Sequence, residues 1–137
     1  MKYIIILLLS VVCTQSFSNT LEKCLSSTSE NVKTCADKNI KNLTLNNCFA
    51  EAEKIKSDLS KENLKQFCFY QVSEFPTVST CLNASEKMAL AINHDEAVFE
   101  CVRQFQERLT ENQCRKISEK LKYADKAKHL NRLCDQL

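Results

Sequence analysis

Cysteines recur at a fixed interval along the chain, and this spacing limits the possible folds more than any other feature. One series comprises Cys35, Cys68, Cys101 and Cys134, and a second comprises Cys48, Cys81 and Cys114, both in steps of 33. A threonine precedes each member of the second series by four positions, at Thr44, Thr77 and Thr110. Self-similarity at a fixed period indicates a repeat architecture, in which each repeat buries its apolar face against the next.

Each repeat has the pattern of two antiparallel helices. Apolar residues recur at helical spacing around both cysteine series, so that one stripe runs through Leu45, Cys48, Ala52, Ile55 and Leu59. The recurring threonines are expected N-caps, and Ser60 is expected to cap the first return helix. The chain has no glycine, which excludes glycine-rich phosphate loops and disfavours the tight hairpins of an all-β fold.

We therefore predict an all-α fold of disulfide-stapled antiparallel helical hairpins, stacked as a short α-solenoid or an irregular bundle. The hairpins are expected at about 20–43, 44–76, 77–109 and 110–137.

The N-terminus, residues 1–18, has the pattern of a secretory signal peptide. Lys2 precedes an apolar run from Ile4 to Cys13, and Ser16 and Ser18 occupy the −3 and −1 positions of a cleavage site. The run is too short to cross a bilayer, which needs about 20 residues. A bacterial lipoprotein modified at Cys13 is the alternative, disfavoured by the bulky residue before it. The sequence thus predicts a secreted single domain at 19–137.

Without the signal peptide the chain has eight cysteines and a net charge of +1, from 18 basic and 17 acidic residues. An even number of cysteines behind a signal peptide predicts disulfides in an oxidising, extracellular compartment. The near-neutral charge argues against nucleic acid or an anionic membrane as the main partner.

The positions of the expected turns favour sequential disulfide pairing. The midpoints of the pairs in the last three hairpins fall beside turns expected at residues 59–60, 92–93 and 124–125. The rival set (Cys35–Cys48, Cys68–Cys81, Cys101–Cys114) centres inside expected helix ends and leaves Cys24 with Cys134. The predicted pairs are therefore Cys24–Cys35, Cys48–Cys68, Cys81–Cys101 and Cys114–Cys134. Gaps of 10, 12 or 19 residues between successive cysteines do not fit a structural zinc site.

No catalytic motif is recognisable. The chain has no H-E-x-x-H sequence and no arguable Ser/His/Asp arrangement. His94, followed by Asp95 and Glu96, opens an expected helix, where acidic residues favour the helix dipole. We expect no enzymatic activity, no cofactor and no metal. Two sequons, beginning at Asn42 and Asn83, are possible glycosylation sites.

Aromatic residues around Cys68 suggest a contact surface. Phe67 and Tyr70 are apolar where the next repeat has Glu100 and Arg103, and Phe99 aligns with polar residues of its neighbours. A middle helix that packs on both sides explains this pattern, and so does a partner-binding patch. Our first hypothesis is a secreted, non-enzymatic module that binds an extracellular protein, with Phe67, Tyr70 and Phe99 as possible contacts.

The alternative hypothesis is a carrier of a small hydrophobic ligand. In this case a cavity would be lined by Phe67, Phe69, Phe75, Met88, Phe99 and Phe105. Size, helical content and secretion resemble those of insect odorant-binding proteins. Their C-x-x-x-C pair is missing from this chain, and they are not built on such a repeat.

Overall fold

The computed structural model describes residues 16–27, 31–72 and 74–137, and within these ranges all regular secondary structure is helical. The predicted all-α class is confirmed. Residues 1–15 of the expected signal peptide lie outside the described residues, and Ser16–Ser18 form the start of the first helix.

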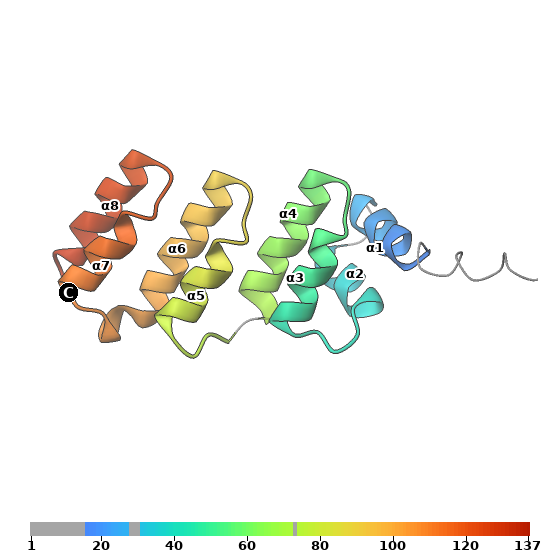
Figure 1. The fold of residues 1–137 in the computed structure, drawn as a ribbon, viewed down its shortest axis with the longest axis horizontal. Helices are drawn as coiled ribbons and strands as arrows, with labels where there is room; N and C mark the ends of the chain where they lie inside the picture. The colour runs from blue at the N-terminus through green and yellow to red at the C-terminus, as the bar shows by residue number, and fades with distance from the viewer. Residues whose placement is uncertain (1–15, 28–30, 73) are drawn as a thin grey trace, which may run out of the picture.

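The helices form four successive pairs, of which the last three lie side by side along the long axis of the molecule (Figure 1). Loops within these three pairs lie at one edge of the row, and connections between pairs lie at the opposite edge. The interpretation of the row as a short α-solenoid stays a prediction. The elements are α1 (Ser16–Ser26), α2 (Val32–Asn39), α3 (Leu45–Glu53), α4 (Asp58–Phe67) with the π-helical turn η1 (Cys68–Val72), α5 (Val78–Ser85), α6 (Ala91–Phe105) with the 3-10 turn η2 (Gln106–Arg108), α7 (Glu111–Ser118) and α8 (Ala124–Cys134).

One disulfide joins the two helices of each pair. The bonds are Cys24–Cys35, Cys48–Cys68, Cys81–Cys101 and Cys114–Cys134, which are the sequential pairs expected from the cysteine spacing. Their Cα atoms are 5.5 to 5.7 Å apart, as in ordinary disulfides. Seven of these eight cysteines are fully buried in the core, so the bonds of the last three pairs lie entirely inside it.

The three recurring threonines cap the first helix of their pairs, as the sequence predicts. The side chains of Thr44, Thr77 and Thr110 accept a hydrogen bond from the backbone N–H three positions later, at 3.2 to 3.3 Å. Thr77 with Thr80, and Thr110 with Gln113, form complete capping boxes. Each cap satisfies a backbone donor that would otherwise be unpaired.

The predicted turns within the pairs are wrong by several positions. The loop before α4 ends at Ser57, which is the true N-cap, whereas Ser60 is buried in the first turn and donates its N–H to the Ser57 side chain. Leu59, expected in a buried stripe, is 68% exposed. The later loops lie at 86–90 and 119–123. The first helix of each of these pairs is shorter than the second, so the midpoint between paired cysteines falls inside the second helix.

Candidate functional site: a cleft between α6 and α8

A cleft of about 1070 Å³ lies between α6 and α8, and Tyr70 of η1 also lines it. This volume is at the upper end of the range for ligand pockets. Three of its apolar side chains are exposed to solvent, and the others lie deeper. The apolar lining comprises Tyr70, Phe99, Val102, Leu130, Leu133 and Leu137.

Two contacts define how α6 and α8 face each other. Lys126 Nζ lies 3.1 Å from Glu96 Oε1, and the rings of Phe99 and His129 are 5.8 Å apart between centroids. Both contacts join positions separated by 30 in the chain. The two helices therefore run in the same direction, and each α6 side chain on this face lies opposite the α8 side chain at this same separation.

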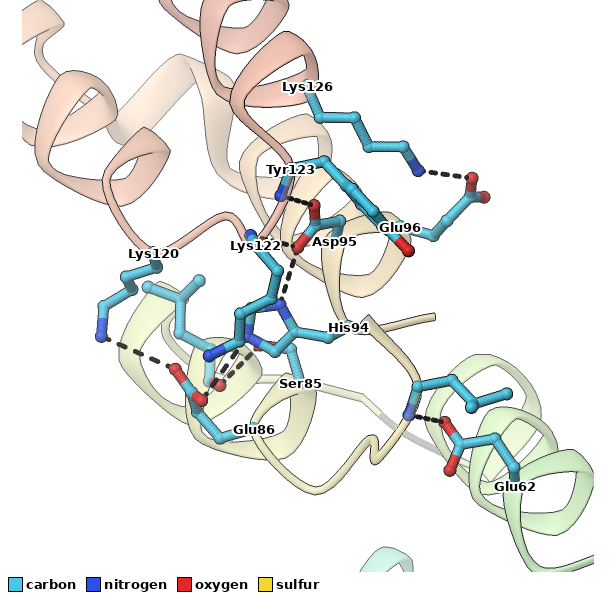
Figure 2. Close-up of polar contacts among 12 residues, drawn as sticks. Glu62, Ser85, Glu86, His94, Asp95, Glu96, Lys120, Lys122, Tyr123 and Lys126 are labelled. Carbon is cyan, nitrogen blue, oxygen red and sulfur yellow. Dashed lines mark hydrogen bonds and ion pairs between the residues drawn. The ribbon is translucent and has the colours of Figure 1, made fainter. Parts of the chain in front are cut away.

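Asp95 fixes the start of α8 and with it one wall of the cleft (Figure 2). Its side chain is fully buried, and its two oxygens accept the backbone N–H groups of Lys122 at 2.8 Å and Tyr123 at 3.0 Å. Tyr123 is the N-cap residue of α8, and its own side chain makes no capping hydrogen bond. A carboxylate from the preceding helix pair thus lies at the positive end of the α8 dipole.

Asp95 is in contact with the buried His94. His94 Nδ1 lies 2.9 Å from Asp95 Oδ1, while His94 Nε2 lies 3.5 Å from Oε2 of the exposed Glu86 and has no hydrogen-bond partner among the described residues. Burial would raise the pKa of Asp95, but the backbone N–H groups and His94 together hold the pKa below its ordinary value of 3.8. Asp95 is therefore negatively charged at neutral pH, in contact with two backbone donors.

The same arrangement occurs at the preceding junction. Glu62 of α4 is buried and accepts the N–H groups of Ala89 at 3.1 Å and Leu90 at 3.2 Å, and Leu90 is the uncapped N-cap residue of α6. Glu62 and Asp95 occupy the same position in successive repeats. We call this contact, an acidic side chain bound to the loop of the next helix pair, a carboxylate clip.

The first junction uses a different residue, because the first helix pair is shorter. Glu22 of α1 accepts the N–H of Ser57 at 2.9 Å, and Ser57 is the N-cap residue of α4. None of the three clips is predicted from the sequence above. The matching position of Glu62 and Asp95 in successive repeats is the signal that could reveal two of them, whereas an acidic residue at a helix start alone indicates only a favourable interaction with the helix dipole.

The aromatic residues chosen from the sequence fall into two groups. Tyr70 and Phe99 line the cleft, whereas Phe67 is half-buried and packs against the core. Tyr70 also contacts the buried Phe69 edge to face, with 5.0 Å between ring centroids. Among the residues expected to line a carrier cavity, Phe99 lines the cleft, and Phe69, Phe75, Met88 and Phe105 belong to the packed core or its margin.

Both sequon asparagines are exposed and lie outside the cleft. Asn42 follows α2 in a left-handed conformation, with φ of 50°. Asn83 lies within α5, and the hydroxyl of Ser85 in the same sequon is buried and donates to the Leu82 carbonyl at 2.7 Å.

Comparisons with known proteins found no matching family model, no matching curated protein and no matching solved structure. Within residues 16–27, 31–72 and 74–137, no three His, Cys, Asp or Glu side chains are grouped closely enough to hold a metal ion. In the same part of the chain no helix has the length and apolar character needed to span a membrane.

Proposed function

We propose that this is an exported, non-enzymatic binding protein, and that its α6–α8 cleft binds an apolar segment of an extracellular partner protein. The observation that carries the proposal is the distribution of exposed apolar side chains. Seven large ones are exposed in the described part of the chain, and Tyr70, Leu133 and Leu137 line this one cleft. Grouped exposed apolar residues within a polar rim are typical of an interaction site.

The polar groups of the cleft support binding rather than catalysis. Glu96 pairs with Lys126, and Glu100 forms two hydrogen bonds with Arg103 at 2.6 and 2.8 Å. The hydrogen bonds from Arg103 lower the pKa of Glu100, which moves it away from the working pH that a general acid or base needs. The four disulfides fit an extracellular, oxidising compartment.

Two tyrosines of nearly equal exposure provide a matched test. Tyr70 is 43% exposed and lines the cleft, while Tyr123 is 44% exposed and lies outside it. Peptides selected from a random displayed library on the immobilised protein are measured by calorimetry against the wild type, Tyr70→Ala and Tyr123→Ala. A buried aromatic anchor is worth about 2 kcal/mol, so Tyr70→Ala is expected to weaken binding about 30-fold.

Tyr123→Ala is expected to leave the affinity unchanged, because only its backbone takes part in a described contact with Asp95. Equal affinities of the two variants would contradict the assignment of the cleft. Failure of the selection to yield any peptide would contradict protein binding itself.

The volume of the cleft favours one alternative, the carriage of a small hydrophobic ligand. Native mass spectrometry of protein purified from its source would then show a bound small molecule. Its release on Phe99→Ala substitution would assign the ligand to the cleft.

A further inference from the structure

The charged side chains of the cleft are separated along its length. Near the start of α8 the lining residues are Glu96, Asp125 and Lys126, and near its end they are Arg103 and Arg132, together with Glu100. Asp125 and Arg132 are two helical turns apart on α8, which corresponds to about 10 Å. The separation of 30 between facing positions places Arg103 opposite Leu133, the residue that follows Arg132, and both arginines line the cleft. One end of the cleft is thus net acidic and the other net basic.

The basic end has unused hydrogen-bonding capacity. No carboxylate of the described residues lies within ion-pair distance of Arg132, which is exposed in the cleft. Arg103 donates from Nε and one terminal nitrogen to Glu100, which leaves its second terminal nitrogen. Guanidinium groups bind carboxylates and related anions in a planar, bidentate manner.

The opposite end is unfavourable for an anion. Burial, then the charges of Glu96 and Glu100, raise the pKa of Tyr70. Glu96 thus acts on the hydroxyl of Tyr70, and the two carboxylates Glu96 and Asp125 outweigh the single cation Lys126 at this end of the cleft. An anionic ligand would be repelled there and attracted toward Arg132, with the mutually tilted rings of Phe99 and His129 between the two ends.

We infer that the cleft prefers an apolar ligand that carries an anionic group, with the anion at Arg132 and the apolar part on Phe99 and His129. This inference rests on the proposed function, because it concerns the same cleft. The occupant is therefore a segment of the partner protein that combines aromatic and acidic side chains.

Two fluorescent probes of similar shape and different charge test the inference. The anionic probe is 1-anilinonaphthalene-8-sulfonate, and the neutral one is N-phenyl-1-naphthylamine. We expect the wild type to bind the anion more tightly. A hydrogen bond to a charged group contributes about tenfold or more to affinity. Arg132→Gln should therefore lower the affinity for the anionic probe by about tenfold and leave the affinity for the neutral probe unchanged.

Two further variants separate the possible failures. Arg108→Gln removes an exposed arginine outside the cleft and should leave the affinity for both probes unchanged. Phe99→Ala should lower the affinity for both probes. If Phe99→Ala weakens the binding of both probes but Arg132→Gln does not change the affinity for the anionic probe, the inferred preference for an anion is wrong, whereas binding of the probes in the cleft is supported. If neither probe binds, the inference is overturned, while the peptide selection still decides the proposed function.

Competition against the bound anionic probe tests whether the occupant is a protein segment. We expect displacement by selected peptides that lose potency when their acidic side chains are changed to amides. Displacement by dodecanoate, with no displacement by selected peptides, would overturn the inference in favour of a fatty acid. Displacement by dodecanol as effective as that by dodecanoate would contradict a role for the anion.

Discussion

Asp95→Asn tests whether the carboxylate clips hold the helix pairs together. Asp95 is fully buried and bonds to the backbone N–H groups of Lys122 and Tyr123 and to the ring of His94. Asparagine has nearly the same shape but only one accepting oxygen. Its amide nitrogen would face a donor that then has no acceptor.

The expected loss of stability follows from these contacts. A buried N–H left without a partner costs about 1 to 3 kcal/mol. The remaining hydrogen bonds lose their charge assistance, which about halves their strength. Together these effects predict that the free energy of unfolding falls by about 3 to 5 kcal/mol at neutral pH.

Urea unfolding with intact disulfides, followed by far-UV circular dichroism, measures this loss. The matched control is Glu96→Gln at the next position, because Glu96 is 58% exposed in its ion pair with the half-buried Lys126. It should cost less than about 1 kcal/mol. A loss below about 1 kcal/mol for Asp95→Asn, or equal losses for both variants, would refute a structural role for the clip.

Three further predictions concern charge and the disulfides. The folded-state pKa of Asp95 lies below 3.8, so the ionised side chain contributes fully to the free energy of unfolding above that pH and loses this contribution as the pH falls through the lowered pKa. The free energy of unfolding of the wild type should therefore fall more steeply in acid than that of Asp95→Asn. Parallel dependences on pH for the two proteins would disprove this. Removing the bond between Cys81 and Cys101, which closes a loop with a sequence separation of 20, should lower the unfolding free energy by about 3 kcal/mol in calorimetry; a change below about 1 kcal/mol would contradict the entropic account of the loop. Lys65 is buried and pairs with the exposed Glu53 at 2.7 Å. Lys65→Met should change the free energy of unfolding in urea by less than about 1 kcal/mol, because Glu53 remains solvated without its partner. A loss above about 3 kcal/mol would show that the ion pair itself is needed for stability.

Local features of the fold could be predicted from the sequence. The threonine caps follow from short-range hydrogen bonding, and the cysteines within apolar stripes indicate which helix faces meet. The turn positions could not be found in this way, because pairing symmetry assumes helices of equal length. Ser57 and Ser60 are both suitable caps by residue type, and the contact of Glu22 with the Ser57 N–H is a long-range feature that the local sequence does not reveal.

The clips and the cleft depend on contacts between neighbouring helix pairs. Glu62 and Asp95 have sequence surroundings of ordinary helix starts, and their burial follows from the placement of the next loop. Likewise, the near-neutral net charge does not reveal the separation of Glu96 and Arg132 along the cleft, because a net charge contains no information about where the charged residues lie. The separation of 30 residues between facing positions of α6 and α8 could not be predicted from the sequence either, because it differs from the 33-residue period of the repeat.

The clips supply a rule for building longer molecules of this kind. Position 128, one repeat after Asp95, is an exposed lysine, so the last pair presents no acceptor there for the loop of another unit. Exchanging Lys128 for aspartate and appending a copy of residues 110–137 would give an engineer a defined docking register. The length of the protein would then become an adjustable design variable.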